Sequence, residues 1–275
     1  MKSITCILSG VGVSGYSALA LMEFFHQQHR KPDLLIGCST GALISALWAS
    51  EYHPTQALKI VLDVFEVSLS KKVDFLTALT FFKSAHGQYK EDHALLNPEK
   101  LKAIYKEIFK DQKIEDLPIR CIFQTTEVQT GETYFLKKGL VCDAVYAASA
   151  MLPFYPPIRI NNRLLTDGVF TEALPLRAVL DENPEVIIAL DVQARDDKKH
   201  KNLMSYYTNF MHNALRLSSA YRTALVYDLH NDEILIIPIK IMVSDSDSQE
   251  GLKKAINAAR EVILAKKENL VELIG

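Results

Sequence analysis

A serine flanked by two glycines, where an apolar strand pattern meets an apolar helix pattern, constrains this chain more than any other feature. Residues 37–41 read Gly-Cys-Ser-Thr-Gly; Leu-Leu-Ile precedes them and Ala-Leu-Ile-Ser-Ala-Leu follows. A strand that turns sharply into a helix at Gly-X-Ser-X-Gly is typical of a nucleophile elbow, which exposes the serine hydroxyl. Gly37 and Gly41 would permit the close backbone packing that this turn needs. The alternative interpretation is that Ser39 only caps a buried helix.

The rest of the chain alternates between strand and helix patterns. This alternation predicts an α/β fold, a three-layer sandwich with a mostly parallel central sheet, because several apolar runs suit strands buried on both faces. Residues 129–131, Gln-Thr-Gly, predict a hairpin turn. One domain is expected over 1–275, with a helical C-terminal part. Strands are predicted at 4–9, 34–36, 119–126, 132–136, 164–166, 186–192 and 234–239; helices at 16–28, 41–50, 55–68, 98–109, 175–181, 203–227 and 251–273.

Composition narrows the function classes. Acidic and basic residues nearly cancel, 33 against 31, so general electrostatics do not favour nucleic acid as a partner. The four cysteines have no metal-ligand spacing and are expected to be reduced thiols in a cytoplasmic protein, with no metal and no cofactor. The N-terminus lacks a secretory signal, which leaves only signal-independent export open. No apolar run reaches the length of a membrane span, so any membrane contact is expected to be peripheral.

A second glycine motif follows the first predicted strand. Residues 10–15 read Gly-Val-Gly-Val-Ser-Gly, which fits the dinucleotide fingerprint only in form. That fingerprint needs an acidic residue at the far end of the second strand, whereas Asp33 lies at its beginning. A glycine-rich turn before a helix also presents free amides to an anion, although an ordinary strand–helix turn is the simpler alternative. The expected oxyanion donors are the amides of Gly10, Val11 and Gly12, joined by that of Thr40.

A third block, Asp167-Gly168, stands after a short predicted strand. Asp-Gly alone is a common turn signal. Here it follows Ala-Ser-Ala at 148–150 and Phe-Tyr-Pro-Pro at 154–157. A serine on an elbow, a glycine-rich loop and a distal aspartate therefore occur in order along one α/β pattern.

These three ordered blocks, with the small-residue run, resemble the patatin-like phospholipase family over residues 4–175. The resemblance implies a lipid acyl hydrolase, of phospholipase A or carboxylic ester hydrolase type, that acts through an acyl-enzyme intermediate without histidine. Ser39 would be the nucleophile and Asp167 its general base. The substrate would be a lipid or another ester, and whether a protein activator is required stays open. The motif glycines under this resemblance are Gly15, Gly37, Gly41 and Gly168.

The chain departs from the family pattern at three positions. Val11 replaces the second glycine of the usual run, Ser14 replaces a basic residue, and Val169 replaces the usual Gly or Ala after Asp-Gly. A β-branched residue resists positive φ, so Val11 would deform the loop if that conformation were needed there. The second hypothesis is accordingly a catalytically weak relative that binds lipid or a protein partner.

A conventional triad is the main mechanistic alternative, since His200, His212 and His230 follow Asp167. Only 38 residues precede Ser39, however, which is too few for the strands that an α/β-hydrolase places before its elbow. Residues 64–88 present apolar side chains on one helical face with lysines beside them. They are interpreted either as a lid that faces lipid or as a core helix.

Overall fold

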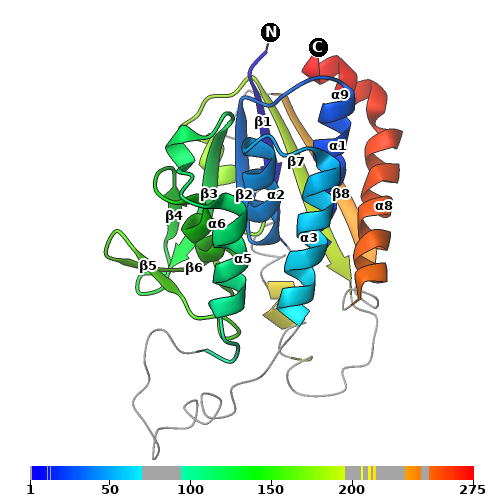
Figure 1. The fold of residues 1–275 in the computed structure, drawn as a ribbon. Coiled ribbons are helices and arrows are strands. Elements are labelled where there is room, and N and C mark those ends of the chain that lie inside the picture. Colours follow the sequence, from blue (N-terminus) through cyan, green and yellow to red (C-terminus); the bar gives the residue numbers. More distant parts are fainter. Residues whose placement is uncertain are drawn as a thin grey trace, which may run out of the picture.

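The computed structural model of this chain describes residues 2–10, 12, 14–69, 94–195, 206, 210–211, 213–214, 233–242 and 248–275. Its centre is one eight-stranded sheet with the strand order β5-β6-β3-β2-β1-β7-β8, and β4 pairs with β3 outside this path (Figure 1). The strands are β1 (Ile4–Leu8), β2 (Leu34–Cys38), β3 (Arg120–Glu127), β4 (Thr133–Leu136), β5 (Ile158–Ile160), β6 (Arg163–Asp167), β7 (Val186–Arg195) and β8 (Glu233–Met242).

The middle of the sheet is parallel and one side is antiparallel. β1 pairs in parallel with both β2 and β7, β2 with β3, and β7 with β8. β4 and β6 run antiparallel to β3, and β5 runs antiparallel to β6. The predicted α/β fold with a mostly parallel central sheet is therefore confirmed, as is the hairpin turn at 129–131. The two central strands β1 and β2 are buried at every position, as expected for strands covered on both faces of a parallel sheet.

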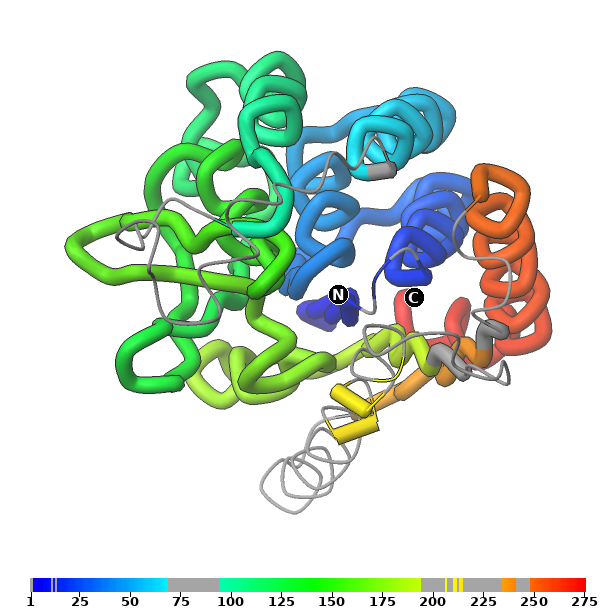
Figure 2. Tube along the Cα trace, turned by 90° about the horizontal axis from the view of Figure 1, so that it is seen from below, coloured from blue at the N-terminus to red at the C-terminus, as the bar shows by residue number. Residues whose placement is uncertain are grey.

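The longer helices gather on one face of this sheet, as Figures 1 and 2 show. Side chains from these helices and from alternate strand positions form the larger hydrophobic cluster. The opposite face carries a smaller cluster, which the chain around Leu174–Val179 covers. The helices are α1 (Leu19–Gln27), α2 (Thr40–Ala49), α3 (Pro54–Leu69), α5 (Glu99–Phe109), α6 (Val141–Ser149), α8 (Gln249–Ala265) and α9 (Lys267–Ile274), with the 3-10 turns η1 (Ser14–Ala18), η3 (Ile114–Asp116), η4 (Gly168–Phe170) and η5 (Leu176–Val179).

Some predicted elements differ from those observed. The helix expected at 175–181 is the 3-10 turn η5, and Pro175 before it has ψ 57°, outside the helical region. The helix expected at 251–273 is divided at Lys266 into α8 and α9. α6 and β5 were not predicted. The expected second layer of helices consists, in the described residues, of η5 alone, and the helix predicted at 203–227 lies largely outside them.

The topology brings two of the sequence motifs to one edge of the sheet. β1 and β2 are adjacent and parallel, with Leu8 opposite Gly37, so both strands end at the same edge. The glycine loop follows β1 and the serine elbow follows β2. Their proximity is therefore a direct consequence of the strand order.

Candidate active site

Ser39 lies between the end of β2 and the start of α2, in a conformation that few non-glycine residues adopt. Its φ is 51° and its ψ is −128°. Such backbone strain persists only where the surroundings enforce it, and it is the geometry of a nucleophile elbow. The Ser39 amide donates to Ala148 O at 3.0 Å, which helps to hold the turn. Its side chain makes no capping hydrogen bond to α2, so the helix-cap interpretation was wrong.

The glycines on each side of the elbow allow it to sit close to its neighbours. A Cβ on Gly37 would lie 2.6 Å from Ser45 Oγ and 2.7 Å from Ala42 Cα. A Cβ on Gly41 would lie 2.4 Å from the carbonyl oxygen of Leu8. All three distances are shorter than real Cβ contacts, and those to Ala42 Cα and Leu8 O involve backbone atoms, which cannot move aside easily. The Gly-X-Ser-X-Gly pattern thus reflects packing of the elbow against β1 and α2.

Asp167 lies at the end of β6, and its carboxylate contacts the serine directly. Ser39 Oγ donates to Asp167 Oδ2 at 2.7 Å, and the Val169 amide donates to Oδ1 at 2.9 Å. Only 1% of Asp167 is exposed. Burial raises the pKa of Asp167 to about 7, and the hydrogen bonds from Val169 and Ser39 oppose that rise without cancelling it. Val169, one of the departures from the family pattern, supplies only its amide here.

Two structural elements bring Ser39 and Asp167 together. In β3, Gln124 pairs with Cys38 of β2, and the next residue, Thr125, pairs with Asp167 of β6. The C-terminal end of α6 contacts both partners, because Ala148 O accepts from the Ser39 amide and Ala150 O accepts from the Asp167 amide at 3.2 Å. The small residues of the Ala-Ser-Ala run therefore bridge Ser39 and Asp167.

Gln124 is a site residue that the sequence reasoning missed. It is fully buried, and its Nε2 donates to Gly168 O at 2.9 Å and to Glu172 O at 2.6 Å. These bonds fasten the turn after Asp167 to β3. Gly168 must be a glycine for this packing, since a Cβ there would lie 2.4 Å from Gln124 O. A glutamine inside an otherwise apolar strand was the signal that could have identified it.

The glycine loop packs directly on the elbow. A Cβ on Gly10 would lie 2.2 Å from Ser39 Cβ, and a Cβ on Gly15 would lie 2.0 Å from Thr40 Oγ1. Gly12 has φ +51°, and a Cβ there would meet nothing within 4 Å. The Gly10 amide already donates to Ala173 O, at 3.4 Å.

Of the expected oxyanion donors, Gly10 packs against Ser39, Gly12 accepts a hydrogen bond from Thr40, the residue after Ser39, and Val11 lies outside the described residues. Thr40 is the first residue of α2. The first amides of a helix have no partner within the helix, and the helix dipole makes this end positive. The Thr40 amide therefore lies at the positive end of α2, directly after Ser39 in the chain.

The competing interpretations fare differently. The three histidines of the alternative triad, and the apolar part of the proposed lid beyond residue 69, lie outside the described residues. Cys38 is a poor nucleophile, because burial first, then the charges of Asp167 and Glu172, raise the pKa of its thiol. Within the described ranges no group of three His, Cys, Asp or Glu side chains could hold a metal ion. No helix in those same ranges is both long and apolar enough to cross a bilayer.

Comparison with known proteins places the motifs in a family. A family model described as patatin-like phospholipase matches residues 7–180. Lysophospholipase NTE1 of Scheffersomyces stipitis is 25% identical over 203 residues, which are 73% of this chain and 12% of that protein. NTE1 of Saccharomyces cerevisiae is 25% identical over 197 residues, 72% of this chain and 11% of that protein. Patatin-like phospholipase domain-containing protein 7 of Rattus norvegicus is 24% identical over 198 residues, which are 71% of this chain and 14% of that protein.

This chain thus spans between 11% and 14% of the length of these three curated relatives. Among solved structures, the crystal structure of VipD from Legionella pneumophila matches with a TM-score of 0.55 and 11% sequence identity. The match covers 96% of this chain and 66% of that one. At this identity the likeness concerns the fold alone, and it agrees with the sheet described above.

Proposed function

This chain belongs to the patatin-like phospholipase family, and from that premise we propose that it is a serine hydrolase that removes acyl groups from lipid esters with a Ser39–Asp167 dyad. The observation that carries the proposal is the 2.7 Å hydrogen bond from Ser39 Oγ to Asp167 Oδ2. It joins a serine on a strained elbow to a buried carboxylate whose pKa is about 7. A base with a pKa near neutrality suits the removal of a hydroxyl proton at physiological pH.

In the first half of the reaction, Ser39 Oγ attacks the ester carbonyl carbon while its proton passes to Asp167 Oδ2. The carbonyl oxygen becomes an oxyanion, which the Thr40 amide and the glycine loop stabilise together with the positive end of α2. The tetrahedral intermediate then collapses. The C–O bond to the leaving alcohol breaks, the alcohol takes the proton from Asp167, and the acyl group stays on Ser39.

In the second half, water replaces the alcohol. Asp167 removes a proton from the water as it attacks the acyl carbonyl, and the same donors hold the second oxyanion. The bond between the acyl carbon and Ser39 Oγ breaks, and the proton returns from Asp167 to Ser39. A free fatty acid leaves, and the dyad is restored. No third side chain is needed, because the short hydrogen bond already fixes the orientation of both partners.

The proposed substrates are phospholipids or their monoacyl derivatives. The relatives at 24–25% identity include proteins named lysophospholipase, which supports a glycerophospholipid ester over a small soluble ester. Such substrates reside in membranes or micelles. We therefore propose that the protein contacts a lipid surface peripherally. The proposed location is the cytoplasm, and whether a protein activator is required stays open.

The test compares wild type with Ser39→Ala and Asp167→Asn on three substrates: mixed phospholipid vesicles, lysophosphatidylcholine micelles and p-nitrophenyl butyrate. Fatty acid release from a lipid substrate by wild type, reduced at least about 10³-fold in both variants, is the expected result. A fluorophosphonate probe should label wild type at Ser39 and leave Ser39→Ala unlabelled. Circular dichroism of each variant verifies that it is folded.

Two results would contradict the proposal. Full activity in folded Asp167→Asn would remove the dyad. Absence of both turnover and probe labelling in wild type would instead support the second hypothesis, a relative that binds lipid or a protein partner. The short Ser39–Asp167 contact argues against that hypothesis, because a binding protein has no need of a serine aligned on a desolvated carboxylate.

A further inference from the structure

The glycine loop and the elbow meet along a short contact that we call the loop–elbow seam. It consists of Gly10, Gly12 and Gly15 on the loop, and Ser39 and Thr40 on the elbow. Gly10 faces the Ser39 side chain and Gly15 faces the Thr40 side chain, both too closely for a Cβ. Gly12 joins the seam through its carbonyl oxygen. The loop thus lies on the nucleophile and on the residue after it.

The Gly12 carbonyl is held by two donors. Thr40 Oγ1 donates to it at 2.7 Å, and the Gly15 amide donates at 3.1 Å. A carbonyl oxygen can only accept a hydrogen bond, so the Thr40 hydroxyl is the donor. Gly12 itself is exposed and has φ +51°, and no side-chain packing would restrain it. Among the described residues, these two hydrogen bonds hold its carbonyl oxygen in place.

The Thr40 hydroxyl does not serve its own helix. A threonine at a helix start commonly bonds to an amide of the same helix. Here the hydroxyl bonds instead to a carbonyl 28 residues earlier in the chain. The preceding residue, Ser39, does not cap α2 either. Two hydroxyls at one helix N-terminus are thus directed at the site, one toward Asp167 and one toward the loop.

We propose that the Thr40 hydroxyl is a positioning group, which fixes the glycine loop in the conformation that stabilises the oxyanion. This role is distinct from that of the Thr40 amide and rests on the proposed acyl-transfer function. Catalysis gains from donors that are already in place when charge develops. Without the hydroxyl, Gly12 keeps one of its two restraints, and the loop must be ordered during the reaction. The free energy needed to order the loop then raises the barrier of the chemical step more than it weakens substrate binding.

The experiment measures kcat and KM on p-nitrophenyl butyrate for wild type, Thr40→Val and Thr40→Ser. Valine keeps the shape and removes the hydroxyl, whereas serine keeps the hydroxyl. We expect kcat to fall about 10- to 100-fold in Thr40→Val with KM within about twofold, less than the 10²- to 10³-fold loss typical of a deleted oxyanion donor. Thr40→Ser should retain kcat within about threefold of wild type, and the rate of fluorophosphonate labelling should follow kcat.

The matched control is Thr130→Val, which removes a threonine hydroxyl that accepts from the Glu132 amide in the β3–β4 turn. Its kcat should equal that of wild type. If Thr40→Val does not fold, Thr40→Ala replaces it with the same expected loss. An unchanged kcat in folded Thr40→Val, or failure of serine to restore kcat, overturns the assignment while the proposed function stands. Absence of serine-dependent turnover in wild type overturns both.

Discussion

At the scale of single residues, the buried carboxylate of Asp167 should set the pH dependence of the reaction. Asp167 must be ionised to accept the Ser39 proton, and its pKa is about 7 because burial disfavours its charge. We therefore expect kcat/KM to be constant above about pH 8 and to fall about tenfold for each pH unit well below 7. The rate of p-nitrophenyl butyrate hydrolysis between pH 4.5 and 9 measures this. A midpoint near pH 4, the usual range of an aspartate, would mean that Asp167 is not desolvated.

Also at the residue scale, Ser39 can keep its observed position only because Gly10 has no side chain. In Gly10→Ala the new Cβ would lie 2.2 Å from Ser39 Cβ and 2.3 Å from Cys38 O, so Ser39 or the loop must move. We expect hydrolysis to fall by about 10² or more, since small displacements at a reacting centre are costly. Overpacking should also lower the free energy of unfolding by about 1–3 kcal/mol.

Gly131→Ala separates these two effects. Gly131 has φ +72° in the β3–β4 turn with open space around it, so alanine there is strained by about 1–2 kcal/mol but touches nothing in the site. It should lose stability and keep its activity. Equal losses of activity in the two variants would assign the Gly10 effect to unfolding and not to the position of Ser39.

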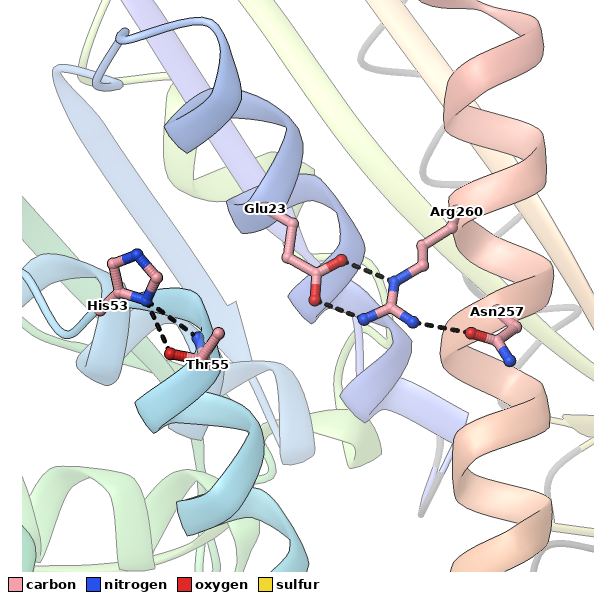
Figure 3. A network of polar contacts seen from close by, with 5 residues as sticks. All are labelled: Glu23, His53, Thr55, Asn257 and Arg260. Carbon is pink, nitrogen blue, oxygen red and sulfur yellow. Dashed lines mark hydrogen bonds and ion pairs between the residues drawn. The ribbon is translucent and has the colours of Figure 1, made fainter.

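At the scale of elements, α8 is attached to α1 by a two-pronged ion pair, which Figure 3 shows. Arg260 Nε and Nη2 donate to the two carboxylate oxygens of Glu23 at 2.7 and 2.6 Å, and Arg260 Nη1 donates to Asn257 at 2.7 Å. The Glu23 side chain is 17% exposed, so the pair is less screened than most surface pairs. α8 is thereby joined to α1, the first α-helix after the glycine loop.

Arg260→Gln should lower the free energy of unfolding by about 1 kcal/mol, because the bidentate geometry and partial burial exceed the usual surface case. This corresponds to a decrease in Tm of about 2–4 °C. The control on the same helix is Lys254→Gln, which breaks the exposed 3.2 Å pair with Glu250 and should change Tm little. A double-mutant cycle with Glu23→Gln isolates the pair energy, and a coupling of zero would contradict the prediction.

Also at this scale, the elements that could be predicted were those with a clear periodicity. The strands were recognisable as apolar runs, and α2 followed directly from the elbow pattern. α6 was missed because it is short and seven of its nine residues are buried, so no single apolar stripe marks it. β5 was missed because it has only three residues, none of them fully buried, which is too short for an alternating pattern to be recognised. The 3-10 turn η5 looked like a helix since its apolar spacing is the same over one turn.

At the scale of the whole molecule, motif order could predict which residues lie in the site but not what holds them together. The positions of Ser39 and Asp167 were identified from their motifs, 128 residues apart in the chain. The sequence did not reveal the roles of Gln124 and of the carbonyls of Ala148 and Ala150. These roles depend on strand register and on which helix end faces the elbow. Main-chain contacts between distant segments leave no residue-type pattern in a single sequence.

The buried carboxylate also has a consequence for the stability of the whole fold. The folded-state pKa of Asp167, about 7, lies above its unfolded value, near 3.9. Folding therefore favours the protonated form of Asp167. The stability that this carboxyl contributes to the folded state is fully present below about pH 4 and is lost as the pH rises toward 7. One pKa unit corresponds to about 1.4 kcal/mol, so this pKa difference lowers the free energy of unfolding by on the order of 4 kcal/mol at neutral pH. The buried carboxylate of the proposed dyad thus lowers the stability of the folded state at neutral pH, as groups placed for function often do.

Asp167→Asn cannot ionise, so it should escape this loss. Relative to wild type, its Tm should be similar near pH 4.5, should rise by several degrees as the pH approaches 7, and should then level off. Thermal unfolding of both proteins between pH 4.5 and 8.5 measures the difference. Asp116→Asn, the same substitution at an exposed aspartate, serves as the control. A Tm difference between Asp167→Asn and wild type that does not change with pH would show that the carboxylate ionises as easily in the folded protein as in the unfolded chain, which is incompatible with its proposed role as a base of raised pKa.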